Sequence, residues 1–414
     1  MKKTLLVAFT VLISLGLLAQ EQKEVVTGVG YADDVYYSLE NGTLTTVDRT
    51  NWDIAFVTSP QSISILANNG SGVELYTFPG GDIDDWASLD TTGMVWTHMY
   101  NSIETFDAGA FTAHELGHPD YGWGIYNMSS HFTEGDSLFV IKTIAGDFKK
   151  LAIIQKTGSL NNWEFKMANL DGTEELLDTV KAGDYLEKSF VYYSLDNNEV
   201  LDREPPTVEW DLLFTKYYDY TIPYIVTGVL INDDHVLAQE VRESGMDQSN
   251  HNTYKDSAFK SNISEIGYDW KKLNESYSYD IIDTVVYYIK SLSETDSSYY
   301  KLYFTGFSGS MGGGIYTFMQ EEMDFGVSTE TIETAPMSQV YPNPAADRIN
   351  VVFDFVGRSD IDIIDMTGRL VHSTHYDTSG FTNLSLDVSS LNPGVFFIRM
   401  SAEGESNVLR FIKE

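Results

Sequence analysis

Short apolar runs separated by turn residues recur along the whole chain. Most alternate or run apolar over four to seven residues and are rich in Tyr, Phe, Val, Ile and Thr, the residue types that favour strands. The clearest are Leu138–Thr143, Lys150–Gln155, Thr284–Lys290 and Lys301–Phe304. Long amphipathic stretches with capping residues are nearly absent. The pattern predicts an all-β protein of mostly antiparallel sheets, with one or two helical turns in each unit.

The chain between residues 24 and 326 repeats itself. Tyr36-Tyr37-Ser38-Leu39 recurs as Tyr192-Tyr193-Ser194-Leu195, and Trp52-Asp53-Ile54-Ala55-Phe56 recurs as Trp210-Asp211-Leu212-Leu213-Phe214. Four further pairs follow in the same order: Ala110-Phe111 with Ala258-Phe259, Trp123 with Trp270, Ile141-Lys142 with Ile289-Lys290, and Lys150-Leu151 with Lys301-Leu302. Six ordered matches predict two related antiparallel β domains in tandem, 24–180 and 184–326.

Each repeat carries a Trp-Asp pair, at Trp52 and at Trp210. A tryptophan of this kind most simply anchors a corner of the core, because its ring buries a large apolar area. A neighbouring aspartate can accept hydrogen bonds from the backbone of a nearby turn. We therefore predict a structural role for both pairs.

The last 75 residues have the pattern of a separate small β domain. Their apolar runs, divided by turns at Thr367-Gly368 and Asn392-Pro393-Gly394, are Arg348–Phe353, Ile361–Ile364, Leu384–Val388, Val395–Met400 and Val408–Ile412. The preceding residues 327–339 are rich in Ser, Thr and Glu, which is typical of an extended linker. We expect a C-terminal small β-sandwich over 340–414.

The N-terminus and the composition indicate export. Met1-Lys2-Lys3, the apolar run Leu5 to Leu18 and Ala19-Gln20-Glu21 have the charged, apolar and polar regions of a signal peptide over 1–20. The run is shorter than the ~20 residues that span a bilayer, so no transmembrane anchor is expected. The chain has no cysteine, which excludes disulfides and thiolate chemistry. Its net charge of −35 makes nucleic acid an unfavourable partner.

Four spaced elements at the C-terminal end carry a resemblance to a known family. They are Tyr341-Pro342-Asn343-Pro344, Asp365-Met366-Thr367-Gly368-Arg369, Leu391-Asn392-Pro393-Gly394-Val395-Phe396 and Phe411-Ile412-Lys413-Glu414. The segment 340–414 resembles the type A C-terminal sorting domain of the type IX secretion system of Bacteroidetes. The resemblance implies that the secretion machinery recognises 340–414, and that the domain is usually removed when the cargo is attached to the cell surface or released.

The two repeats resemble the HmuY-like haemophore family of Bacteroidetes. The residues that carry this resemblance are the strand pair before each Trp-Asp-x-x-Phe, at Trp52 and Trp210, and the late elements Phe139–Lys142 with Phe148–Leu151 and Tyr288–Lys290 with Tyr300–Phe307. The resemblance implies a β-rich binding fold and makes haem a candidate ligand. Family members are often single lipid-anchored domains, whereas this chain has two copies and no cysteine.

Haem binding would need axial ligands inside an apolar cleft, supplied by His nitrogen or Met sulfur. Among the histidines and methionines that fall in loops between the predicted strands, we single out His98, His131, His235 and His251. Their spacing does not single out one pair. They are the candidate cofactor-binding residues, and exposed loop positions remain the alternative for each.

His114-Glu115-Leu116-Gly117-His118 matches the H-E-x-x-H pattern of zinc hydrolases. That chemistry needs both imidazoles on one helical face and the glutamate as a base. Pro119 disfavours helical dihedrals at His118, and the second repeat has no metal ligand in the equivalent stretch, so we expect a surface loop without a metal.

The sequence therefore predicts a secreted or cell-surface, non-enzymatic binding protein, with haem as one candidate ligand. Its alternative is a structural or adhesive surface protein that presents its loops to a surface protein or a glycan. A zinc metallohydrolase using His114, Glu115 and His118 is the third hypothesis.

Overall fold

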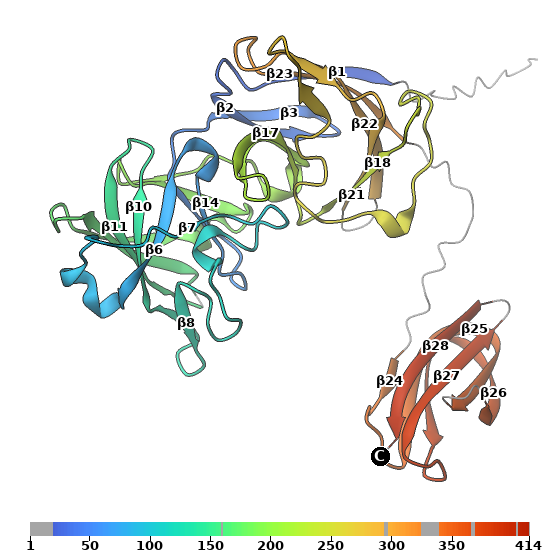
Figure 1. Cartoon of the computed structure of the whole chain (residues 1–414). Coiled ribbons are helices and arrows are strands. Elements are labelled where there is room, and N and C mark those ends of the chain that lie inside the picture. The colour runs from blue at the N-terminus through green and yellow to red at the C-terminus, as the bar shows by residue number, and fades with distance from the viewer. Residues whose placement is uncertain are drawn as a thin grey trace, which may run out of the picture. The chain divides into compact units, whose positions relative to one another are not determined.

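The computed structural model describes residues 20–158, 160–293, 297–323, 339–365, 369–402 and 405–413. Except for Gln20 and Gln339, the predicted signal peptide and linker lie outside the described residues. The chain divides into two compact units, 1–324 and 325–414. Strands dominate both units and confirm the predicted all-β fold (Figure 1). The helical turns of the described residues are short 3-10 helices: η1 (Asn69–Ser71), η2 (Ile83–Ser88), η3 (Ala110–Thr112), η4 (Ala182–Tyr185), η5 (Thr207–Glu209) and η6 (Asp256–Ala258).

The larger unit holds two lobes, each with two sheets around its own core. We call residues 52–201 the first lobe. Its larger sheet is ordered β13-β12-β11-β10-β6-β7, with β9 also paired to β11 and β8 to β9, and its smaller sheet is ordered β15-β14-β4-β5. The strands are β4 (Ile54–Val57), β5 (Ile65–Ala67), β6 (Glu74–Asp82), β7 (His98–Met99), β8 (Gly124–Asn127), β9 (Phe132–Gly135), β10 (Ser137–Lys142), β11 (Phe148–Lys156), β12 (Asn162–Asn169), β13 (Leu176–Lys181), β14 (Phe190–Ser194) and β15 (Glu199–Leu201).

The second lobe combines residues 20–49 with residues 210–323. Its sheets are ordered β1-β23-β22-β21-β18 and β17-β16-β2-β3, with a separate hairpin β19-β20. The strands are β1 (Glu21–Val26), β2 (Asp33–Ser38), β3 (Gly42–Asp48), β16 (Leu212–Asp219), β17 (Tyr224–Ile231), β18 (Val236–Arg242), β19 (Lys271–Leu273), β20 (Tyr279–Ile281), β21 (Val285–Leu292), β22 (Ser297–Phe307) and β23 (Ile315–Glu322). The four strands singled out in the sequence correspond to β10, β11, β21 and β22.

The two repeats exchange their first hairpins. Strand β2 of the first repeat pairs with β16, whereas β14 of the second repeat pairs with β4. The two registers are equivalent, since Ile54 faces Tyr193 just as Leu212 faces Tyr37. Each core accordingly contains side chains from both repeats. The predicted segments 24–180 and 184–326 therefore do not form two independent sandwiches, although their origin as repeats stays a prediction.

The Trp-Asp pairs fasten the exchanged hairpins. Asp53 accepts hydrogen bonds from the backbone N–H groups of Leu195 (2.7 Å) and Ile144 (2.8 Å). Asp211 accepts one from Leu39 (2.7 Å) in the reciprocal position. Both tryptophans are buried. The predicted structural role of the pairs is confirmed, and the bonds to Leu195 and Leu39 each reach a turn of the other repeat.

The C-terminal unit is an antiparallel sheet with a hydrophobic core of its own. Its strands are β24 (Gln339–Tyr341), β25 (Arg348–Asp365), β26 (Leu370–Asp387), β27 (Gly394–Ala402) and β28 (Glu405–Lys413), in the order β24-β25-β27-β28 with β26 on β25. Two of the predicted runs belong to one long strand, β25. Alternate residues such as Ile361 and Ile363 are fully buried and face this core, as period-2 patterning requires.

Candidate functional site

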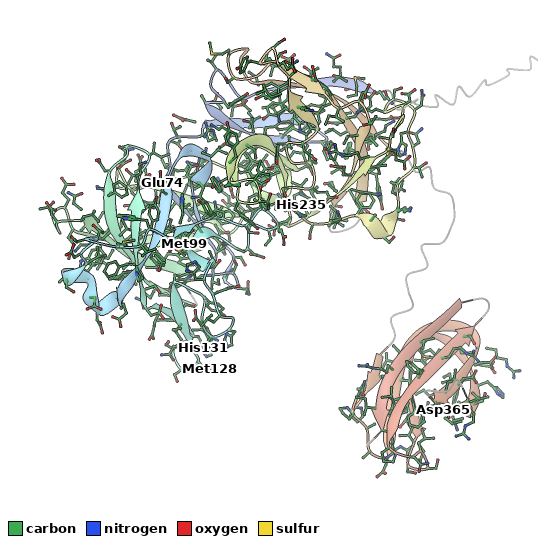
Figure 2. The ribbon with its side chains drawn as sticks, in the orientation of Figure 1. Glu74, Met99, Met128, His131, His235 and Asp365 are labelled. Atoms are coloured by element: carbon green, nitrogen blue, oxygen red, sulfur yellow. The ribbon has the colours of Figure 1, made fainter. Side chains whose placement is uncertain are left out.

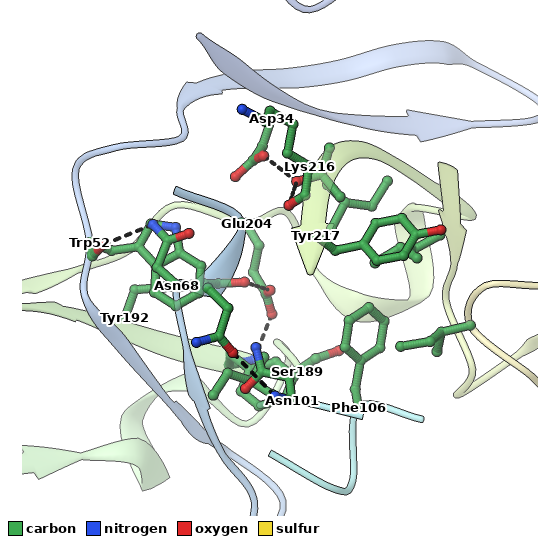
Figure 3. Close-up of a pocket in the computed structure, with 18 of the residues that line it drawn as sticks. Asp34, Trp52, Asn68, Asn101, Phe106, Ser189, Tyr192, Glu204, Lys216 and Tyr217 are labelled. Atoms are coloured by element: carbon green, nitrogen blue, oxygen red, sulfur yellow. Dashed lines mark hydrogen bonds between the residues drawn. The ribbon is translucent and has the colours of Figure 1, made fainter. Parts of the chain in front are cut away.

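A small chamber lies between the two lobes, where the exchanged hairpins meet (Figure 3). Its walls come from β2, from the turn before β4, from residues 101–106 and from the 203–204 segment. Tyr36 and Tyr192, equivalent positions of the two repeats, are both buried there, and their hydroxyl oxygens lie 3.1 Å apart. Tyr36 packs edge-on against Trp210, and Tyr192 packs in the same way against Trp52.

A buried charged network crosses the chamber wall. Arg203 donates from Nη2 to Asp34 at 3.0 Å and to the carbonyl oxygen of Asp48 at 2.9 Å. Its guanidinium also lies over the rings of Trp52 and Tyr192, at 5.7 and 4.9 Å from their centroids. Since the Arg203 and Asp34 side chains are only 4% and 5% exposed, the pair joins the second-lobe strand β2 to the 203 segment inside the protein.

Glu204 is the second buried acid of the network. Its carboxylate accepts hydrogen bonds from the backbone N–H of Phe190 (2.7 Å) and from the hydroxyl of Tyr192 (2.8 Å). Burial raises the pKa of Glu204 to about 7, although these two hydrogen bonds and Arg203 act in the opposite direction. The group therefore changes its charge near neutral pH.

Three N–H groups of the chamber residues have no hydrogen-bond partner within the described part of the chain: Arg203 Nε, Trp52 Nε1 and Trp210 Nε1. Buried donors of this kind normally bind a protein acceptor or an ordered water. The chamber has a volume of about 90 Å³, enough for a few water molecules or a ligand of similar size. A macrocycle such as haem does not fit in it.

An open groove of about 1,090 Å³ adjoins the chamber. Phe106 and Phe190 line both spaces. The groove is bordered by the segments 57–63, 105–107, 186–190, 207–208 and 233–235, and its lining mixes apolar side chains with a larger number of polar ones. Leu186 and Val208 at this site are 59% and 81% exposed. The groove therefore offers apolar contact to a ligand much larger than the chamber admits.

Acidic residues of the β17–β18 turn fix one side of the groove. Asp233 accepts hydrogen bonds from the Thr105 hydroxyl (2.7 Å) and the Phe106 backbone N–H (3.1 Å), which ties the two lobes together. Burial raises the pKa of Asp233, and burial together with the Asp107 carboxylate raises that of Asp234. His235 follows in the same turn, with Nε2 at 3.6 Å from Asp211. Its Nδ1 is buried without a partner among the described residues.

The four candidate haem ligands lie on different elements. His235 lines the groove, whereas His98 belongs to β7 and stacks on Tyr76. His131 is exposed between β8 and β9 and bonds the Tyr126 hydroxyl at 2.9 Å (Figure 2). His251, between β18 and β19, bonds the Tyr288 hydroxyl at 2.7 Å. Within the described residues, no contact joins any two of these histidines, and whether they bind haem stays a prediction.

The H-E-x-x-H segment forms an exposed loop after η3, which ends at Thr112. Gly117 has φ +87°, and His118 bonds the hydroxyl of Tyr121 at 3.0 Å. His114 and His118 therefore do not share a helical face. Over the described residues, no group of three His, Asp or Glu side chains with metal-binding geometry is found.

The charged chamber residues Asp34, Arg203 and Glu204 were not anticipated from the sequence. Tyr36 and Tyr192 stand at equivalent positions of the two repeats, which draws attention to them. Arg203 and Glu204 precede Pro205-Pro206, and a charged pair before two prolines is typical of an exposed loop. Burial of these charges depends on the exchange of hairpins, which the local pattern does not encode.

The C-terminal unit can be assigned by comparison with known families. Residues 339–414 match the family described as the secretion system C-terminal sorting domain. The C-terminal unit is a sorting domain. It identifies the chain as a secreted Bacteroidetes protein that uses the type IX secretion machinery and reaches the cell surface or the medium. The predicted boundary at residue 340 differs from the matched one by a single position.

The larger unit has no comparable assignment. A comparison with curated proteins gave no match. Among solved structures, dimeric latent PorU from Porphyromonas gingivalis is 10% identical with a TM-score of 0.18, over 95% of this chain, and the chain spans about a third (34%) of PorU. The BSP domain of a biofilm associated protein is also 10% identical, with a TM-score of 0.17, over 92% of this chain and 82% of that domain. The HmuY-like resemblance stays a prediction.

No described helix is long and apolar enough to cross a membrane.

Proposed function

We propose that the chain is a secreted, non-enzymatic binding protein that takes its ligand in the groove between the lobes. The groove itself supports this proposal. Its volume of about 1,090 Å³ is on the scale of small-molecule sites, and its lining combines apolar side chains with a larger number of polar ones. Loops from both lobes border it, so the exchanged hairpins hold the two sides in a fixed relation.

Haem is the ligand to test first. Of the four candidate histidines, His235 is the one that lines the groove. Among the described residues, no second His and no Met lines the groove. A haem bound there through His235 would therefore have one protein ligand, and we expect a five-coordinate spectrum.

The experiment is a haem titration of the chain without its signal peptide, followed at the Soret band. We expect saturable binding that His235→Ala abolishes and that His131→Ala, an exposed histidine outside the groove, leaves unchanged. Saturable binding that survives His235→Ala would place haem at His98, His131 or His251 and contradict the groove. A non-saturating response would favour the structural or adhesive alternative.

The zinc hydrolase hypothesis has its own test. We expect the dialysed protein to contain close to zero zinc per chain. We also expect the wild type and His114→Ala to show the same peptidase activity. Stoichiometric zinc that is lost in this variant would contradict the non-enzymatic proposal.

A further inference from the structure

A row of six aromatic rings runs along one side of the larger unit, away from the groove lining. Each ring contacts the next, with centroid distances of 5.6, 5.0, 5.0, 4.2 and 4.1 Å. In order, the members of this aromatic band are Phe148, Trp96, Tyr76, His98, Tyr100 and Tyr218. The first five belong to the first lobe and Tyr218 to the second, so the band crosses from one lobe to the other.

The local backbone explains the row. The rings of Trp96 and His98 both contact Tyr76, and His98 also contacts Tyr100, while Met99 is 2% exposed and belongs to the core. Strand β7 pairs with β6 so that His98 lies directly opposite Tyr76.

The band is open to solvent at the end formed by Trp96 and Phe148. Trp96 is 44% exposed and Phe148 is 39% exposed, while the other four rings are partly buried. Soluble proteins usually bury such rings or use them for binding. A single row also differs from a protein-binding hot spot, where aromatic anchors cluster in a compact desolvated centre.

The charge around the band favours a neutral ligand. Glu74 accepts hydrogen bonds from the Tyr76 hydroxyl and from Lys142 Nζ, the latter at 2.9 Å, so the charges of Glu74 and Lys142 neutralise each other. The net charge of −35 disfavours a stacked nucleic acid strand, which is the other common ligand of an aromatic row.

We propose that the aromatic band binds a neutral polysaccharide at its exposed end, where a sugar ring packs against Trp96 and Phe148. This site is separate from the groove, so its test does not depend on the function proposed there.

The test is affinity electrophoresis of the chain without its signal peptide, in gels containing β-glucan, galactomannan, xylan, α-mannan or starch. Alginate serves as an acidic control and immobilised gelatin as a protein control. We expect retardation in at least one neutral polysaccharide and an affinity about tenfold lower for Trp96→Ala, with partial recovery in Trp96→Phe. Tyr277→Ala, which removes an 88% exposed tyrosine outside the band, should bind like the wild type.

Three results would overturn the proposal. They are no retardation in any neutral polysaccharide, retention by alginate or gelatin alone, and equal retardation of Trp96→Ala and the wild type. Phe148→Ala provides a second variant, because its ring lies at the end of the row and is partly exposed. Equal melting temperatures of variants and wild type would exclude misfolding as the cause of weaker binding.

Discussion

At the scale of single residues, the chamber between the lobes concentrates the unusual chemistry of the protein. Glu204 is buried beside two tyrosines, and its two hydrogen bonds offset only part of the free energy cost of burying its charge. Arg203 already pairs with Asp34, so it does not neutralise Glu204 directly. The proton is therefore held more tightly in the folded protein than in the unfolded chain.

This difference predicts a pH-dependent stability. The pKa of Glu204 is about 7 in the folded state, against 4.5 for an unburied glutamate. Its protonation stabilises the fold fully below about pH 4.5, and this contribution is lost as the pH rises through about 7. Glu204→Gln keeps a neutral side chain at every pH. The difference in free energy of unfolding between this variant and the wild type should therefore increase in favour of the variant, by up to about 3 kcal/mol, from pH 4.5 to pH 8.

Urea unfolding followed by tryptophan fluorescence measures this effect, because all seven tryptophans belong to the larger unit. Glu199→Gln, at an exposed position on β15, should follow the wild-type curve at every pH. A constant difference between Glu204→Gln and the wild type from pH 4.5 to 8 would show that Glu204 does not change its charge in this range.

At the scale of elements, the exchange of hairpins is the central feature of the larger unit. The strands themselves could be predicted, because alternation and β-branched or aromatic residues mark β10 and β21 regardless of their partners. Their partners could not. Since β2 and β14 share the Tyr-Tyr-Ser-Leu pattern, each could complete either sheet, and local sequence does not distinguish the two pairings.

The candidate site was harder to predict for the same reason. His235 could be named as a histidine in a loop, but its place in the groove depends on how the lobes meet. Trp96 belongs to no recognisable sequence motif. Its spacing of two residues from His98, and of four from Tyr100, is the pattern expected for side chains on the same side of a strand.

Engineered disulfides can distinguish the two pairings, because the natural chain has no cysteine. Ala55 faces Tyr192 in the exchanged arrangement. Without exchange, it would face the equivalent residue, Tyr36. Opposed residues of antiparallel strands are close enough for a disulfide. We expect mild oxidation to cross-link Ala55→Cys with Tyr192→Cys inside one chain, as a mobility shift on non-reducing gels.

Ala55→Cys with Tyr36→Cys is the matched control, because it replaces the other tyrosine of the same pair. It should remain reduced under the same conditions. Cross-linking of this control in place of the first pair would contradict the exchange.

At the scale of the whole molecule, the two units have separate tasks. The sorting domain has its own core, made of residues within 339–414, and the larger unit completes its two cores without it. The candidate sites, the groove and the aromatic band, belong to the larger unit alone. Loss of the sorting domain should therefore change where the protein goes without changing what it binds.

Deletion of residues 339–414 tests this division. In a Bacteroidetes host with a working type IX system, the truncated protein should accumulate in the periplasm, because the secretion machinery no longer recognises it. The full-length Tyr277→Ala variant is the control and should be displayed or released like the wild type. Fractionation with immunoblotting measures the location, and the tryptophan fluorescence of the purified truncated protein should match that of the full chain. Undiminished surface display of the truncated protein would show that another segment directs its export.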